Sequence, residues 1–313
     1  MKILLAKPRG FCAGVNMAIQ CVEEALKYVG TPLFVYHEIV HNRHVVERFV
    51  RQGVIFVDGI DEVPNNSMVI FSAHGVSPEV RKQAEQRGCT MIDATCPLVT
   101  KVHMEAIRYA RQGYTIILIG HAGHDEVVGT VGEAPNAIVI VESVADVNKL
   151  PFAQDAKLVY LTQTTLSLDD ASNIIRAIKQ RYPNVKEPPS SDICYATTNR
   201  QRAVHALSEQ ADLVLVVGSR NSSNSLRLTE IAENQGKHAF LVDDVRELDH
   251  TWFQNIKTVL LTAGASAPED LVQGIIAELE KHYGATVEEQ HIIDEDMHFE
   301  LPVSLRVLHE SPR

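Results

Sequence analysis

Residues 194–225 read CYATTNRQRAVHALSEQADLVLVVGSRNSSNS, and their pattern decides the fold. A cysteine opens a helical pattern, an apolar run rich in β-branched residues follows, and a polar loop comes next. The same order occurs in CAGVNMAIQCVEEALKYVGTPLFVYHEIVHN at 12–42 and in CPLVTKVHMEAIRYARQGYTIILIGHAGHDE at 96–126. Repetition of one supersecondary unit predicts three related α/β units.

Each repeat continues with a second apolar run and a second polar loop. These loops contain His74 in FSAHG, Thr164 in LTQTT and Ser266 in LTAGAS, and we assign the three residues to equivalent places. The apolar runs are short and do not alternate in polarity, which is typical of strands buried on both faces of a parallel sheet. The sequence therefore predicts an α/β fold with small, mainly parallel sheets.

The polar loops fall between the end of a strand and the start of a helix. Ser77 and Ser167 stand at N-cap positions, followed by proline or by acidic residues. Ligands bind at this edge of open parallel sheets, and helix N-termini favour anions. We therefore expect the loops of the three units to form one central site on a pseudo-threefold axis.

The repeats also predict the domain boundaries. We expect a first α/β unit at 14–96, a second at 97–190, and a third made of 191–282 with 1–13. A C-terminal tail at 283–313 is expected to pack on the third unit or the central region. The stretch PNVKEPPSSD before the third unit reads as a linker, and the end of the chain from His291 has strand-like pieces and no helical pattern.

Composition restricts the class of protein. The net charge of −11 disfavours bulk binding to nucleic acid or to an anionic membrane. No apolar run is long enough for a membrane span, and the apolar start is too short for a signal peptide. We expect a cytoplasmic protein, in which the five cysteines are free thiols or metal ligands rather than disulfides.

Three cysteines are candidate metal ligands because each opens a helix in its repeat: Cys12, Cys96 and Cys194. A helix N-terminus lowers the pKa of a thiol and favours the thiolate. Cys21 and Cys89 fall outside this pattern and are interpreted as structural. Three thiolates suit zinc with an open fourth position, or an iron–sulfur cluster in which one iron has no protein ligand. The residues alone leave both alternatives open.

The polar loops supply candidate ligands for an anion. They are His41, His74, His124, Thr164, Ser222, Ser223, Asn224 and Ser266. Imidazoles, hydroxyls and amides can hold an anion by hydrogen bonds, although a serine such as Ser222 at a helix start is equally explained as a helix cap. Few cations lie in these loops, so imidazolium charge and helix dipoles would carry the electrostatic attraction.

Glu126 is a candidate proton donor. With Asp125 it is the only carboxylate within the six loops, and a dry site beside anions would raise its pKa. The alternative interpretation is an ordinary acidic residue in the first turn of a helix.

Together the motifs resemble the 4-hydroxy-3-methylbut-2-enyl diphosphate reductase family, also called LytB-type. The resemblance runs almost end to end, through PRGFCAGV, HEIVHN, FSAHGVS, DATCPLVTKVH, GHAGHDEVVGT, TQTTLS, DICYATTNRQ, GSRNSSNS and TAGASAP. It implies a trefoil of three α/β units around one [4Fe–4S] cluster, held by Cys12, Cys96 and Cys194, with one open iron.

The resemblance also implies the reaction. The allylic diphosphate substrate would lose its hydroxyl as water in a two-electron reduction that yields isopentenyl and dimethylallyl diphosphates, the isoprenoid precursors. His41, His74, His124, Ser222, Ser223, Asn224 and Ser266 would hold the diphosphate. Thr164 and Glu126 would hold and protonate the hydroxyl. Ferredoxin or flavodoxin would donate the electrons, and we expect a monomer or a weak dimer.

Three residues near the first cysteine depart from those common in this family: Lys7, Asn16 and Met17. Two other functions remain open from the residues themselves. One is a cytosolic zinc enzyme acting on a phosphorylated metabolite through zinc-bound water. The other is an iron–sulfur sensor or cluster carrier, which would need no enclosed proton donor.

Overall fold

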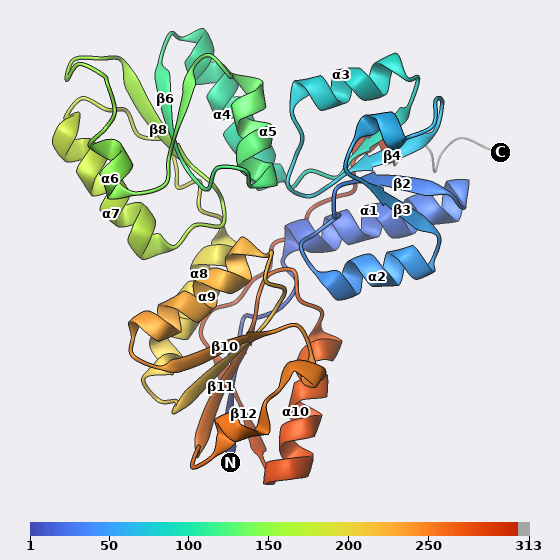
Figure 1. Cartoon of the computed structure of the whole chain (residues 1–313), viewed down its shortest axis with the longest axis vertical. Coiled ribbons are helices and arrows are strands. Elements are labelled where there is room, and N and C mark those ends of the chain that lie inside the picture. Colours follow the sequence, from blue (N-terminus) through green and yellow to red (C-terminus); the bar gives the residue numbers. More distant parts are fainter. Residues whose placement is uncertain (306–313) are drawn as a thin grey trace. The chain divides into compact units, whose positions relative to one another are not determined.

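The computed structural model describes residues 1–305, and its strands form three separate sheets (Figure 1). Every pairing between neighbouring strands is parallel. The predicted fold class is therefore confirmed. Within the described part of the chain, no helix is both long and apolar enough to cross a membrane.

Contacts between residues divide the chain into two compact units. The first unit contains Met1–Val15, His41–Val45 and Tyr195–Met297. The second contains Asn16–Val40, Val46–Cys194 and the described residues from His298 onward. The boundaries of the three α/β units stay predictions from the sequence.

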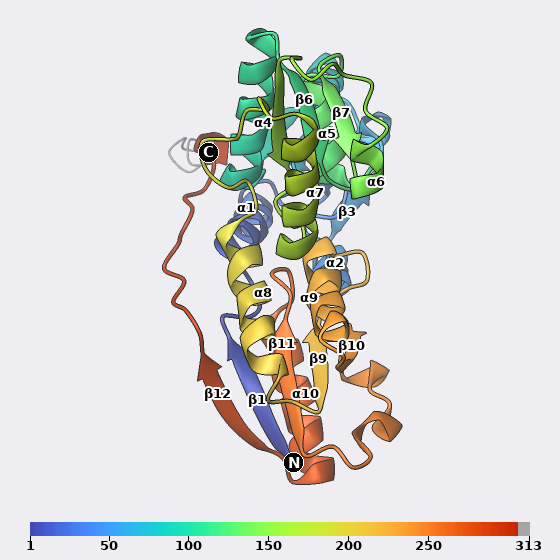
Figure 2. The same ribbon diagram turned by 90° about the vertical axis from the view of Figure 1, so that its left-hand side faces the viewer.

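The first unit is built on a five-stranded sheet in the order β10-β9-β11-β1-β12. The N-terminal strand β1 lies between β11 and β12, and Figure 2 shows β12 running beside β1 at the edge of the sheet. The strands are β1 (Lys2–Lys7), β9 (Leu213–Val217), β10 (His238–Val242), β11 (Thr258–Ala263) and β12 (Thr286–His291).

The second unit contains two smaller sheets, in the orders β3-β2-β4-β5 and β7-β6-β8. The first of these has β2 (Leu33–Tyr36), β3 (Val54–Val57), β4 (Met68–Phe71) and β5 (Thr90–Asp93). The other has β6 (Thr115–Ile119), β7 (Ile138–Val141) and β8 (Leu158–Thr162).

Helices connect the strands, as parallel pairing requires. The α-helices are α1 (Ala13–Val29), α2 (Arg43–Arg51), α3 (Pro78–Gln86), α4 (Pro97–Arg111), α5 (Asp125–Glu133), α6 (Val144–Val147), α7 (Leu168–Arg181), α8 (Tyr195–Ser208), α9 (Ser223–Asn234) and α10 (Glu269–Tyr283). Short 3₁₀ helices are η1 (Ile60–Glu62), η2 (Val245–Glu247) and η3 (His250–Phe253).

The sheet of the first unit is buried on both faces. Alternate side chains of β9 pack toward α10 on one face and toward α8 and α9 on the other. All five residues of β9 are buried, as the unalternating run LVLVV predicts. Helix caps are also confirmed, because Ser77 accepts a hydrogen bond from the amide of Val80 and Ser167 from that of Asp170.

Two irregular stretches differ from their sequence interpretation. Residues 183–192, predicted as a linker, end at Asp192, whose side chain is fully buried and paired with Lys101. Near the C-terminus, the edge strand β12 ends where strand-like pieces were predicted to begin. Residues 292–302 then have neither helix nor strand, and 303–305 form a helical turn.

Candidate functional site

The three candidate cysteines occupy the same local position in three repeats. Each directly precedes a helix, α1, α4 or α8. Each also donates its backbone N–H to the carbonyl two residues beyond a strand end: Cys12 to Ala265 at 3.2 Å, Cys96 to Ala73 at 3.0 Å and Cys194 to Thr164 at 3.0 Å. The repeat inferred from the sequence is therefore present in the backbone.

This register corrects one predicted equivalence. The carbonyls that receive the cysteine amides belong to Ala73, Thr164 and Ala265. Thr164 is therefore equivalent to the residues that precede His74 and Ser266, and Thr165 is the equivalent of those two residues. Spacing in the sequence missed this one-residue offset because the loop contains consecutive threonines.

The five cysteines divide into two classes by exposure. All are free thiols; Cys12, Cys96 and Cys194 are partly exposed, whereas Cys21 and Cys89 are buried. Burial raises the pKa of Cys21 to about 12, with a smaller contribution from Asp93, so this thiol stays protonated. The donor set that remains, three accessible thiols at helix starts, fits a thiolate-ligated metal group.

In the first unit, hydroxyl groups gather where two loops meet. Ser266 donates its hydroxyl to the carbonyl of His41 at 2.9 Å, and its oxygen lies 3.4 Å from that of Ser222. Ser222 caps α9 by accepting the amide of Ser225. The capping interpretation of Ser222 is thus correct, and the same geometry leaves the start of α9 facing this hydroxyl cluster.

Asn224, in the first turn of α9, is the clearest sign of a missing ligand in the first unit. Its side chain is only 4% exposed. Within the described part of the chain, neither its amide nitrogen nor its amide oxygen has a hydrogen-bond partner. A buried amide without partners costs free energy, so a polar ligand is expected to complete it.

In the second unit, Glu126 is buried and held by Thr164. Glu126 is 2% exposed, and its two carboxylate oxygens accept from the Thr164 amide at 2.7 Å and the Thr164 hydroxyl at 2.9 Å. The carbonyl of Thr164 accepts the amide of Cys194. The predicted proton donor, its threonine partner and a candidate metal ligand are therefore joined by consecutive hydrogen bonds.

Burial controls the ionisation of Glu126. Desolvation raises its pKa to about 7, while the hydrogen bonds from Thr164 oppose the shift and the charge of Asp192 adds to it. A carboxyl group with a pKa near neutrality can carry and release a proton at physiological pH. The alternative of an ordinary first-turn acid does not fit, because such a residue would be exposed.

The raised pKa of Glu126 predicts a pH dependence of stability. The unfolded carboxyl ionises near its ordinary pKa of 4.5, whereas the folded one keeps its proton to about 7. The folded state therefore binds more protons in this interval, and the free energy of unfolding falls as pH rises from 4.5 to 7. The full decrease is on the order of 3 kcal/mol and is complete above the folded pKa.

Glu126→Gln should remove this contribution. Relative to the parent protein, the variant should become more stable as pH rises from 4.5 to 7, with no further change above that. Urea unfolding at pH 5 and pH 8, with both proteins in the same cofactor state, measures the difference. An identical stability difference between the two proteins at both pH values would contradict the raised pKa.

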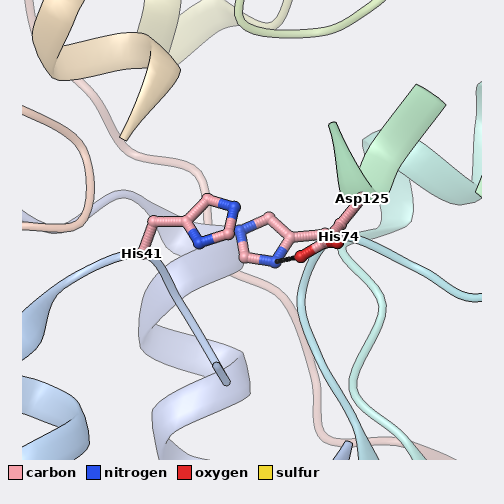
Figure 3. Close-up of side chains that lie close together, drawn as sticks. All are labelled: His41, His74 and Asp125. Carbon is pink, nitrogen blue, oxygen red and sulfur yellow. Dashed lines mark ion pairs between the residues drawn. The ribbon is translucent and has the colours of Figure 1, made fainter. Parts of the chain in front are cut away.

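Two imidazoles flank the start of α5. The His74 and His124 rings lie 6.1 Å apart and nearly perpendicular. His74 Nδ1 lies 3.9 Å from a carboxylate oxygen of Asp125, the ion pair drawn in Figure 3. Asp125 also bonds His37 Nδ1 at 2.9 Å, and this hydrogen bond raises the pKa of His37. One carboxylate therefore hydrogen-bonds His37 and lies within ion-pair distance of His74.

The tautomer of His124 follows from its role as a helix cap. Its Nδ1 accepts the amide of Glu126 at 3.2 Å, so a neutral ring carries its proton on Nε2. His124 therefore presents a hydrogen-bond donor away from the helix. Neither His37 nor Asp125 was predicted to take part in the site, although HEIVHN and GHAGHDE contain them.

His103, omitted from the predicted site, packs behind these loops. Its ring is 3% exposed, and its Nδ1 lies 3.2 Å from Glu133. A Cβ atom added at Gly75 or Gly129 would come within about 3.0–3.3 Å of this ring. Glycine is therefore needed at both places for the His74 loop and α5 to close on His103. The sequence did not predict this packing, because a histidine within a helical pattern does not indicate which loops will contact it.

A partly buried ion pair joins the segments that carry Cys96 and Cys194. Lys101 on α4 binds Asp192 at 2.9 Å, and Asp192 also accepts the amide of Thr162 at 3.0 Å. α4 begins after Cys96, and Asp192 lies two residues before Cys194. This contact fixes the two cysteine-bearing segments to each other within the second unit.

Arg200 performs a similar role in the first unit. Its side chain is fully buried and donates to the carbonyl of Gly10 at 2.7 Å, just before Cys12. Glu295 from the C-terminal segment neutralises it at 3.1 Å. The phenol oxygen of Tyr195 accepts the amide of Ala13 at 3.1 Å, on the other side of the same cysteine.

The predicted site residues are therefore distributed over both units. Those in the first unit are Cys12, His41, Ser222, Ser223, Asn224 and Ser266. Those in the second unit are Cys96, Cys194, His74, His124, Glu126 and Thr164. Of the three residues that depart from the family pattern, Lys7 pairs loosely with Glu289 at 3.7 Å, Met17 is buried and Asn16 is exposed.

Parallel sheets with polar loops at their carboxyl ends, a buried acid and thiols at helix starts are typical of the class of α/β enzymes that bind ligands at this edge of a sheet. Comparison with known proteins gives the particular family. The family model described as LytB protein matches residues 3–280, and the chain belongs to this family.

Close relatives carry one common name. The chain is 58% identical to the 4-hydroxy-3-methylbut-2-enyl diphosphate reductase of Rhodopirellula baltica, over 98% of this chain and 96% of that protein. It is 54% identical to the protein of the same name from Shigella flexneri, over 98% of both chains.

Solved structures agree with this assignment. The E-1-hydroxy-2-methyl-but-2-enyl-4-diphosphate reductase from Plasmodium falciparum matches with a TM-score of 0.97 and 40% identity, over 99% of this chain and 98% of that one. A structure of (E)-4-hydroxy-3-methyl-but-2-enyl diphosphate reductase, described as the terminal enzyme of the non-mevalonate pathway, matches with a TM-score of 0.64 and 30% identity, over 90% of this chain and 100% of that one.

Proposed function

We propose that this chain reduces (E)-4-hydroxy-3-methylbut-2-enyl diphosphate to isopentenyl and dimethylallyl diphosphates. Two electrons and two protons enter, the allylic C–O bond breaks, one proton leaves with the hydroxyl as water, and the other joins carbon. The observation that carries the proposal is the buried Glu126, bound through Thr164 to the backbone of Cys194. This arrangement supports the assignment of Glu126 as a proton donor close to Cys194.

Cys12, Cys96 and Cys194 are the ligands that we propose for one [4Fe–4S] cluster. Their accessibility and equivalent helix-start positions support this, and the buried Cys21 and Cys89 are unsuited to it. Such a cluster, with three cysteine ligands, supplies electrons singly and leaves one iron open to the substrate. We also propose that the three α/β units, with the boundaries predicted from the sequence, together form this site.

The polar loops bind the diphosphate in this proposal. His41, His74, His124, Ser222, Ser223, Asn224 and Ser266 supply imidazole, hydroxyl and amide groups. The buried amide of Asn224 supports the assignment, because neither its nitrogen nor its oxygen has a hydrogen-bond partner among the described residues. His124 supports it as an imidazole that can donate through Nε2–H. The start of α9 adds backbone N–H groups and a favourable dipole.

Glu126 and Thr164 act on the hydroxyl that leaves. A protonated Glu126 donates to the departing oxygen, which then leaves as water rather than hydroxide. Thr164 holds the carboxyl group through its hydroxyl and can exchange that hydrogen bond for one to the substrate. The apolar and hydrogen-bonded surroundings keep bulk water from this proton.

A reductase of this kind needs a separate electron donor. We propose ferredoxin or flavodoxin in the cytoplasm, and a protein that works as a monomer or weak dimer.

Anaerobic purification followed by iron, sulfide and zinc analysis tests the proposed cofactor. We expect close to four irons and four sulfides per chain, and conversion of the substrate to both products with a chemical reductant. One zinc and no iron would favour the zinc enzyme instead. An intact cluster without turnover would favour the sensor or carrier.

Replacing a pocket histidine should weaken diphosphate binding and leave the cluster intact. Each charge-assisted hydrogen bond to the substrate contributes about 1.5–3 kcal/mol, so His74→Ala should lower the apparent affinity roughly ten- to a hundred-fold. His124 also caps α5, so His124→Asn is the better variant because asparagine retains a capping oxygen.

Substrate titration and iron content should be measured on the same preparations. His238→Ala is the matched control, because His238 is an exposed residue on β10. It should change neither quantity. A pocket variant that loses iron while its substrate affinity is unchanged would assign that histidine to the cluster and contradict its role in the diphosphate pocket.

A further inference from the structure

Three side chains of the first unit that are not proposed for the reductase site converge on one another. Glu278 and His282 lie four residues apart on α10 (Figure 1), and His250 begins η3. His282 Nε2 lies 3.1 Å from Glu278 Oε1, and His250 Nε2 lies 3.5 Å from the same oxygen. Both imidazoles thus point their Nε2 atoms at one carboxylate oxygen.

Tyr283 contacts both the backbone and the ring of His250. Its hydroxyl can donate to the carbonyl of His250 at 3.3 Å. The phenol oxygen lies 2.8 Å from His250 Nδ1, a contact in which the ring nitrogen or the hydroxyl is the donor, according to the tautomer of the ring. In the tautomer with its proton on Nδ1, a neutral His250 turns the lone pair of Nε2 toward the carboxylate.

A lone pair facing a carboxylate oxygen is repulsive unless a cation lies between them. The cation is either an added proton on the imidazole or a metal ion. Two imidazoles and one carboxylate are a common ligand set for zinc, which also has a fourth, open position. Tetrahedral ligand atoms about 2.0–2.1 Å from zinc lie roughly 3.3 Å apart. The two Nε2–Oε1 distances of 3.1 and 3.5 Å match this separation.

We propose that His250, Glu278 and His282 form a zinc-binding site on the first unit. Candidate ligand atoms of all three residues lie within 4.8 Å of one another. Tyr283 is the partner that orients His250, as the outer hydrogen bonds of zinc-bound histidines usually do. The site does not depend on the proposed reductase function.

The zinc would tie η3 to the C-terminal end of α10. The loop around η3 lies between β10 and β11, and α10 is followed by Gly284 and the edge strand β12. Metal binding at this place stabilises the folded first unit by mass action, since the three ligands come together only when the unit is folded. The role is structural, and it leaves the reaction unchanged.

Zinc titration of the cluster-loaded protein tests the site, with cluster absorbance recorded to show that the cysteines stay occupied. The parent should bind one zinc ion that His282→Asn does not bind. Added zinc should raise the melting temperature of the parent but not that of His282→Asn. Tyr283→Phe should weaken zinc binding about ten- to a hundred-fold. His282 is exposed, so the variant is expected to fold.

His291→Asn is the matched control. His291 is also exposed and also pairs with a carboxylate, Asp294 at 2.8 Å, but belongs to no group of three such ligands among the described residues. The His291→Asn variant should bind zinc as the parent does. Absence of zinc binding in the parent would overturn the proposal. Equal zinc binding by the parent and His282→Asn would also overturn it.

Discussion

Replacing Cys12, Cys96 or Cys194 by serine should remove most of the cluster from the purified protein. Serine keeps the size of the side chain but is a poor ligand for iron, and only three thiolates are proposed to hold the cluster. Loss of one of the three proposed ligands is therefore expected to destabilise the cluster. Iron and sulfide per chain, with visible absorbance after anaerobic reconstitution, measure the loss, and turnover should fall with it.

Cys21→Ala and Cys89→Ala are the matched controls for these variants. Both thiols are buried and lie outside the repeat-equivalent positions, so iron content should stay at the parent level. Loss of a buried sulfur leaves a small cavity, which lowers stability rather than metal content. Full cluster content in all three serine variants would contradict the ligand assignment.

The sequence predicted the fold because each repeat is locally consistent. Apolar runs, cap residues and polar loops occur in the same order three times, and each signal comes from neighbouring residues. The cysteines could be singled out for the same reason, since position at a helix start is a local property. The backbone hydrogen bonds of Cys12, Cys96 and Cys194 confirm that this shared position is structural.

Contacts between distant segments could not be predicted in the same way. The pairing of Lys101 with Asp192, and of Arg200 with Gly10 and Glu295, joins residues that no local pattern relates. The packing of His103 against Gly75 depends on a close approach of two elements. Such contacts follow from tertiary packing, and a single sequence shows only that a charged or polar residue is present.

Register was the other feature that spacing alone could not determine. Thr164 and Thr165 both fit the loop pattern, and only the amide of Cys194 shows which threonine matches Ala73 and Ala265. Glu126 was predicted as the donor, but its contact with both the amide and the hydroxyl of Thr164 was not. These two bonds are what make Thr164 part of the site despite the offset.

Glu126→Gln should keep the cluster and substrate binding and lose most turnover. Glutamine fills the same space and can still accept from Thr164 through its carbonyl oxygen, but it cannot give a proton to the departing oxygen. General acid catalysis contributes roughly 10²–10⁴-fold, so kcat should fall by about that factor while KM changes little. Single-turnover kinetics at saturating substrate measures the chemical step directly.

The matched control is Glu105→Gln, because Glu105 is also a buried glutamate of the second unit with a pKa raised by desolvation. No contact joins its carboxylate to Thr164 among the described residues, so turnover should stay within a few-fold of the parent. Because the pKa of Glu126 is about 7, turnover of the parent should fall as the pH rises above this value. This decrease in turnover at high pH should be absent in Glu126→Gln. Parent-like turnover in Glu126→Gln would mean that another acid, such as the substrate phosphate, supplies the proton, and the buried carboxyl would then only orient Thr164.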